Sequence, residues 1–80
     1  MARPLNFQQI EAFRAVVLLG TTVAAAKTLH TTQPTISRLI GQVQRATGLQ
    51  LFVNGRGRLQ LTREGRHLFE TVQVSFQGMA

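Results

Sequence analysis

Side chains that can recognise a nucleic acid are concentrated between residues 32 and 42. An arginine can donate two parallel hydrogen bonds to the major-groove edge of guanine, and a glutamine can form two with adenine, one donated and one accepted. Hydroxyl groups can donate to phosphate oxygens, and a proline ring can contact the methyl group of thymine. The residues with this chemistry are Thr32, Gln33, Pro34, Thr35, Ser37, Arg38 and Gln42. They are candidate contacts to DNA.

These residues also have ordinary structural interpretations. Gln33 and Pro34 suit the first turn of any helix, and Thr32 can serve as a helix N-cap. Arg38 could form an intramolecular ion pair instead of a contact to guanine or phosphate. The chain has only three acidic residues, and this shortage disfavours the ion pair.

The distribution of charge favours a polyanionic partner. Nine Lys and Arg residues oppose three acids, which gives a net charge of +6. No acid lies between Ala12 and Arg63, a stretch that contains most of the cationic residues. A long basic stretch without acids raises a positive potential over part of the surface, and nucleic acids respond to such a potential. The alternative is a solvated basic surface that aids solubility.

A second group of cationic side chains accompanies a predicted turn. The sequence Asn54-Gly55-Arg56-Gly57 is typical of a β-hairpin turn. Arg56 and Arg58 on such a hairpin can reach a phosphate or a narrow minor groove. A solvated turn without a partner is the alternative interpretation.

Other classes of function have little support in the sequence. Three scattered Glu residues and no Cys provide no credible set of acid, base and nucleophile, so we expect no enzyme activity. His30 and His67 lack partners at ligand spacing, so we expect no metal and no cofactor. Residues 1–6 contain no apolar signal segment, and no apolar run is long enough to span a bilayer. These features favour a cytoplasmic protein without a membrane partner.

Two helices are predicted before the candidate residues. Residues 7–19 form the first, with Asn6 as N-cap and Gln9 in the capping-box position. The residues that recur at helical spacing and should face the core are Phe7, Ile10, Phe13 and Val17. Gly20 should end this helix in a left-handed turn. A short helix over residues 23–29 follows, capped by Thr21 or Thr22.

The third predicted helix carries the candidate residues. It begins after Thr32 as N-cap and ends at Gly48. Its buried stripe consists of Ile36, Leu39, Ile40 and Val43. The side chains about 180° away, which we expect on the exposed face, are those of Pro34, Arg38, Gly41 and Arg45.

After Gly48 the period of the apolar residues changes from helical to alternating. Leu49, Leu51 and Val53 should share one face of a strand, and Leu59 and Leu61 should lie on the return strand. Thr62 is placed to cap a last helix, whose apolar stripe contains Leu68, Phe69, Val72, Phe76 and Met79. This order predicts a mainly α fold, a helix-turn-helix followed by a basic hairpin, or wing.

The stretch from Leu29 to Arg38, LHTTQPTISR, resembles the turn and the start of the recognition helix in the LysR family of bacterial transcription regulators. The resemblance extends over residues 5–79. Its further landmarks are Phe13, Ala25-Ala26, Gly48-Leu49-Gln50-Leu51-Phe52, Leu61-Thr62 and Gly65. The segments Arg56-Gly57-Arg58-Leu59, Leu68-Phe69-Glu70 and Val72-Gln73 look most like the branch that regulates lysine and opine metabolism.

The resemblance implies a winged helix-turn-helix with a three-helix core, a β-hairpin wing and a C-terminal linker helix. Residues 1–62 would be the DNA-binding domain, with residues 32–47 in the major groove and the wing, 54–58, on the backbone or minor groove. Residues 63–80 would begin a linker helix that dimerises. Its dimerisation residues would be Leu68, Val72, Phe76 and Met79.

The resemblance also implies which partners the protein has. The expected partner is double-stranded DNA with an interrupted palindrome, bound by a homodimer. The resemblance also implies a C-terminal domain that binds a small effector, and this domain is absent from the 80 residues. The alternatives to sequence-specific binding are a non-specific nucleic-acid-binding module and a protein-interaction module.

The chain departs from the family pattern at a few positions. Thr22 stands where many members have an aromatic residue, and Gln44 stands where Glu is usual. Gly41 replaces a frequent polar or basic residue of the DNA-facing side, and Gly57 occupies a common wing Arg position. These departures concern the target sequence and the local stability of the helices, not the fold.

Overall fold

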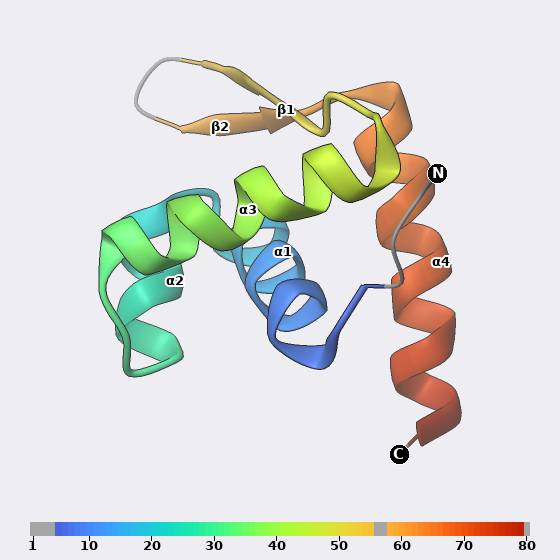
Figure 1. Cartoon of the computed structure of the whole chain (residues 1–80), viewed down its shortest axis with the longest axis horizontal. Coiled ribbons are helices and arrows are strands. Elements are labelled where there is room, and N and C mark those ends of the chain that lie inside the picture. Colours follow the sequence, from blue (N-terminus) through green and yellow to red (C-terminus); the bar gives the residue numbers. More distant parts are fainter. Residues whose placement is uncertain (1–4, 56–57, 80) are drawn as a thin grey trace.

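The computed structural model describes residues 5–55 and 58–79, with side chains to residue 74 (Figure 1). The elements in chain order are α1 (Phe7–Leu19), α2 (Thr22–Thr28), α3 (Gln33–Thr47), β1 (Phe52–Asn54), β2 (Leu59–Leu61) and α4 (Arg63–Met79). Figure 1 shows α1, α2 and α3 packed together, with α2 and α4 at opposite sides of the molecule. The predicted order of elements, and the mainly α class, are confirmed.

Local signals in the sequence set both ends of α1. The side chain of Asn6 accepts a hydrogen bond from the backbone N–H of Gln9 (2.8 Å), and Gln9 Oε1 accepts one from the N–H of Asn6 (3.0 Å). At the other end Gly20 adopts a left-handed φ of 86°, and its N–H donates to the carbonyl of Val16. Both terminal signals that the sequence predicted are therefore in use.

The turn between α2 and α3 depends on a left-handed residue that is not glycine. The N-cap of α2 is Thr21, whose Oγ1 accepts from the N–H of Ala24 (3.1 Å). After α2, His30 has a φ of 57°, and the N–H of Thr31 donates to the carbonyl of Ala26 (2.9 Å). This bond closes the helix end in a Schellman motif. The turn directs the chain into α3 at Thr32.

The core is centred on Phe13, which is fully buried in α1. Its ring lies 5.6 Å from that of Phe52 and 6.5 Å from that of Phe69, both in tilted or edge-on arrangements that aromatic pairs favour. Phe13 thus joins α1 to the hairpin and to α4. Phe7 was predicted to face the core, but 55% of its surface is exposed.

The hairpin differs from the predicted alternation. The two strands are antiparallel and pair Phe52 with Leu61. Leu51 and Phe52 are both buried, whereas Leu49 and Val53 are 37% and 40% exposed, so a common inward face for Leu49, Leu51 and Val53 is wrong. Leu51 lies outside the strand; its N–H donates to Gln44 Oε1 and its carbonyl accepts from Thr62 Oγ1. The strand begins only at Phe52, whose ring packs on Phe13.

The last helix begins against the end of the hairpin. Thr62 Oγ1 accepts from the N–H of Gly65 (2.9 Å) and donates to the carbonyl of Gln50 (2.6 Å). Farther along α4, Val72 is buried, and Gln73 accepts a hydrogen bond from Nε of Arg14 in α1. The predicted cap is confirmed, and the first part of α4 packs against the three-helix unit.

No single helix within the described residues has both the length and the apolar character that crossing a bilayer requires. The α1–α2 pair, bent by 119° at its break, meets those criteria only when the two helices are taken together.

Candidate nucleic-acid interface

The two faces of α3 differ sharply in burial. Ile36 and Val43 are fully buried, and Leu39 and Ile40 are nearly so. The opposite side exposes the side chains of Thr32, Gln33, Pro34, Ser37 and Arg38, while Thr35 and Gln42 are half-buried. The predicted stripe is confirmed, and it anchors the helix so that a polar row faces outward along its first two turns.

The first turn of α3 is stabilised by two hydroxyl groups. Thr32 Oγ1 accepts from the backbone N–H of Thr35 (3.3 Å), which makes Thr32 the N-cap. The Thr32 and Thr35 hydroxyls lie 2.8 Å apart and share a hydrogen bond. Pro34 lies in the same turn, where a missing N–H leaves no helical hydrogen bond unmade. Both threonines therefore have a structural role, and each hydroxyl keeps capacity for a further contact.

Gln33 joins α3 to α2 through its side-chain amide. Nε2 donates to Oγ1 of Thr22 at the start of α2 (3.1 Å) and to Oγ of Ser37 one turn along α3 (2.8 Å). These three side chains form one exposed polar group. The sequence predicted Gln33 and Ser37 as candidate DNA contacts on one helix, but not their mutual hydrogen bond. It did not predict Thr22, because that contact depends on the angle between α2 and α3.

Arg38 lies on the same exposed row as Pro34 and Ser37. Among the described side chains, no carboxylate forms an ion pair with Arg38. The intramolecular ion pair considered above is therefore absent within that part of the chain. With respect to the described side chains, the five donors of the guanidinium therefore remain for a partner outside the chain.

Gln42 lies apart from this group. Its Oε1 accepts from Nε2 of Gln9 (3.0 Å), the residue whose other amide atom completes the capping box of α1. Gln42 is thus held toward the N-terminus of α1 and is half-buried there. Its observed role is to join α3 to α1, which the sequence did not indicate.

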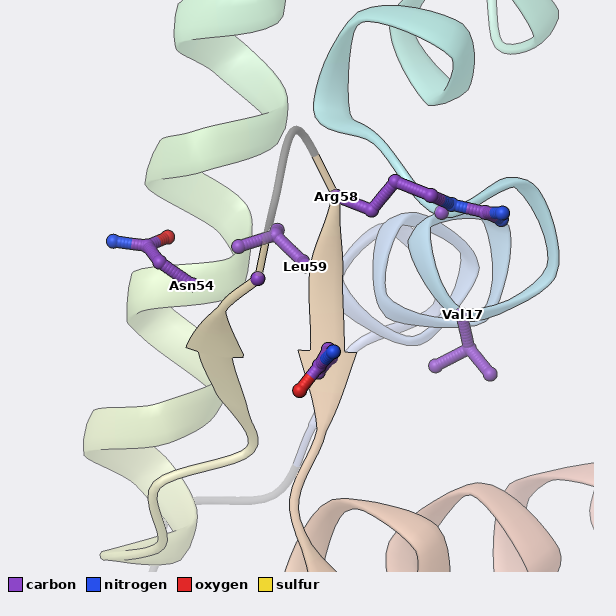
Figure 2. Close-up of a pocket in the computed structure, with 7 residues that line it drawn as sticks. Val17, Asn54, Arg58 and Leu59 are labelled. Carbon is purple, nitrogen blue, oxygen red and sulfur yellow. The ribbon is translucent and has the colours of Figure 1, made fainter.

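Only one of the two predicted wing arginines lies within the described residues. Arg56 lies outside the described residues. Arg58 is exposed and extends from the hairpin to the turn between α1 and α2 (Figure 2). Its guanidinium lies over Gly20, and a Cβ atom on that glycine would come within 2.7 Å of Arg58 Cζ. The next residue, Leu59, donates its N–H to the carbonyl of Gly20 (3.1 Å). The hairpin is thereby attached to the corner of the helix-turn-helix.

The charge of Arg58 suits this position. Gly20 is the C-cap of α1, and α1 has no basic residue in its last turn. Carbonyl groups at a helix C-terminus carry partial negative charge, which a cation stabilises. An open hollow of about 760 Å³ lies beside the guanidinium, between the hairpin and the helices. Its lining consists of Val17, Gly20, Asn54, Gly55, Arg58, Leu59 and Gln60.

Two of the four dimerisation residues predicted on α4 pack against the core of their own chain. Val72 is 5% exposed, and Leu68 is half-buried against the same core. Phe76 and Met79 lie on the helical backbone of α4, but their side chains are outside the described part of the structure. Val74, which was not predicted, is 70% exposed.

Comparison with known proteins identifies the family. The sequence profile described as "Bacterial regulatory helix-turn-helix protein, lysR family" matches residues 7–66. The chain belongs to the LysR family. The transcriptional activator protein LysR of Escherichia coli (strain K12) is 45% identical over 94% of this chain and 24% of its own length. The octopine catabolism/uptake operon regulatory protein OccR of Rhizobium meliloti is 47% identical over 94% of the chain and 25% of its own length.

The chain spans about a quarter of the length of the curated relatives it matches. Solved structures are similar over most of the chain. The CbnR DBD crystallised with DNA has a TM-score of 0.85 at 30% identity, covering 90% of this chain and 83% of that one. The BenM DBD with catB site 1 DNA has a TM-score of 0.87 at 26% identity, covering 92% and 83%. The winged helix-turn-helix fold is thus confirmed.

Proposed function

We propose that this chain binds double-stranded DNA sequence-specifically, as the DNA-binding part of a LysR-type transcription regulator. The observation that carries the proposal is the exposed polar row on α3, opposite a stripe that is buried in the core. An α-helix fits the major groove, where every base pair presents a distinct pattern of donors and acceptors. The similar CbnR and BenM domains crystallised with DNA support the same function.

The residues of the row divide by chemistry. In this proposal Arg38 and Gln33 contact base edges, and Pro34 contacts a thymine methyl group. The remaining side chains are suited to phosphate oxygens, which fix the position of the helix but carry no sequence information. These are Thr32, Thr35, Ser37 and, from its position nearer α1, Gln42.

The wing supplies a second contact in this proposal. Arg58 directly precedes β2, and Arg56 stands two residues earlier in the sequence; in this proposal both reach a phosphate or the minor groove. Arg58 would then turn from Gly20 to the DNA, because its guanidinium is the end of a flexible side chain. The attachment of Leu59 to Gly20 holds the hairpin beside the helix-turn-helix while Arg58 moves.

We further propose that the regulator is a cytoplasmic homodimer that binds an interrupted palindrome. A second copy would contact the apolar stripe of α4. The predicted contact residues are Leu68, Val72, Phe76 and Met79, of which Leu68 and Val72 also pack on the core of their own chain. Two recognition helices would lie about one DNA turn, or a multiple of it, apart. A small effector would act on a further domain in a longer parent protein.

The experiment that tests the function is selection of bound duplexes from a random pool. Sequence-specific binding predicts enrichment of one motif, and a dimer predicts two inverted copies at fixed spacing. Binding without enrichment would assign a non-specific nucleic-acid-binding module. No binding at all would leave a protein-interaction module. Sedimentation of the wild type and of Phe76→Glu, with and without DNA, tests the dimer, and a wild type that stays monomeric on DNA contradicts it.

A further inference from the structure

The amide of Gln33 is oriented by partners on two different helices. Its Nε2 donates to Thr22 in α2 at 3.1 Å and to Ser37 in α3 at 2.8 Å. A primary amide has two N–H donors and one carbonyl acceptor. Both donors are therefore used within the protein, and Oε1 is the part of the amide that remains for an external partner.

Of the two partners of Gln33, Thr22 on α2 is the one that is distant in sequence. Ser37 lies four residues after Gln33 on one helix, so that contact is local. Thr22 is eleven residues earlier, and its hydroxyl meets Gln33 only because α2 and α3 pack closely at this corner. The sequence has Thr22 where many family members carry an aromatic residue. An aromatic hydrocarbon ring offers no oxygen to accept this hydrogen bond.

We propose that Thr22 is a positioning residue that determines which bases Gln33 recognises. With both N–H groups held, Gln33 presents an acceptor to the major groove. The base atoms that can donate to it are the exocyclic amino groups, N6 of adenine and N4 of cytosine. Guanine and thymine present acceptors at the corresponding places and are disfavoured. Without Thr22, a released N–H would let the amide turn and donate as well.

This inference rests on the proposed function and makes a prediction for one position of the DNA site. The wild-type chain should prefer an amino-bearing base opposite Gln33 by about tenfold, the typical size of one good base contact. Thr22→Val has nearly the same shape but lacks the hydroxyl, and it should reduce that preference to about two- or threefold on the same scale. Thr22→Ser keeps the hydroxyl and should retain the wild-type preference.

The test is duplex selection on all three proteins, with melting temperature and circular dichroism as controls for folding. A second measurement follows the side-chain amide protons of Gln33 by ¹⁵N NMR in the free protein. Their hydrogen exchange should be slower in the wild type and Thr22→Ser than in Thr22→Val. This readout needs no DNA, and equal exchange in all three proteins would contradict the hydrogen bond itself.

The outcomes separate this inference from the proposed function. A wild type that enriches no motif overturns both. A wild type that enriches a motif, with the same base preference in Thr22→Val, overturns the inference alone. A uniform loss of affinity for every duplex in Thr22→Val would show a merely structural role and also overturns it. A preference altered at one base position, and restored by Thr22→Ser, supports it.

Discussion

The guanidinium of Arg58 lies directly over Gly20, at the corner between α1 and α2, where a Cβ atom on this glycine would overlap it. The hydrogen bond from Leu59 N–H to the Gly20 carbonyl lies beside this contact. Two neighbouring residues of the hairpin are thus fixed on one residue of the helix-turn-helix. The position of the wing relative to α3 consequently depends on this corner.

Gly20→Ala should destabilise the chain by roughly 1–2 kcal/mol, the cost of a left-handed backbone for a residue with a Cβ atom. The φ of 86° is the main cause, because the guanidinium of Arg58 can move aside. Urea unfolding of Gly20→Ala in the wild-type and Arg58→Ala backgrounds separates the two effects. The cost should be similar in both. A cost that disappears in the Arg58→Ala background would assign it to the clash.

Arg58→Ala should weaken binding to all duplexes and flatten the slope of log affinity against log salt by about 0.9, the value for one phosphate contact. The slope is measured by titrating DNA at several salt concentrations. Arg58→Lys is the matched control, since it keeps the charge. An unchanged slope with lower affinity would mean that Arg58 only holds the hairpin on Gly20. An unchanged slope with unchanged affinity would mean that Arg58 contributes nothing to binding.

Two helical glycines should respond in opposite ways to the same substitution. A Cβ atom on Gly65 would overlap the backbone carbonyl of Leu51 and lie 2.7 Å from Leu61 Cδ1, and the backbone cannot move aside easily. Gly65→Ala should therefore cost about 1–3 kcal/mol. At Gly41 the nearest atom is the flexible end of Arg45, at 3.3 Å. Gly41→Ala should instead add about 0.5–1 kcal/mol through helix propensity. Thermal unfolding measures the stability of both variants. A stabilising Gly65→Ala would contradict the close approach of Gly65 to Leu51 and Leu61.

Gln44 stabilises the start of the hairpin from α3. Its Oε1 accepts the backbone N–H of Leu51 at 2.9 Å. Gln44→Ala leaves this N–H without its partner and should cost about 1–3 kcal/mol. Gln44→Glu keeps an acceptor oxygen and should stay close to the wild type. Chemical unfolding measures both, and equal losses in the two variants would show that this hydrogen bond is not the reason that Gln44 matters.

Features that depend on neighbouring residues were predictable from the sequence. The capping pair Asn6 and Gln9, the left-handed Gly20 and the buried stripe of α3 all follow from spacings of three or four residues. The outward position of Arg38 follows from the same periodicity, because the opposite face of the helix must be buried.

Features that depend on the packing of distant segments were not predictable in the same way. The contact of Thr22 with Gln33 needs the angle between two helices, and the contact of Arg58 with Gly20 needs the docking of the hairpin. The inward face of the hairpin was wrongly predicted because Leu51 is buried just before the strand begins. Alternating burial is expected in a regular strand, and β1 contains only three residues.

Arg38→Ala is the substitution that best tests whether the exposed face of α3 recognises base sequence. Arg38 is exposed opposite the core, so the substitution should leave the fold intact by circular dichroism. Arg45→Ala, on the exposed end of the same face, is the matched control. Affinities are measured for the selected duplex and for a random duplex. We predict that Arg38→Ala loses about 1–3 kcal/mol on the selected duplex and much less on the random one, while Arg45→Ala weakens both alike. Equal losses for Arg38→Ala on the two duplexes would contradict base recognition by this residue.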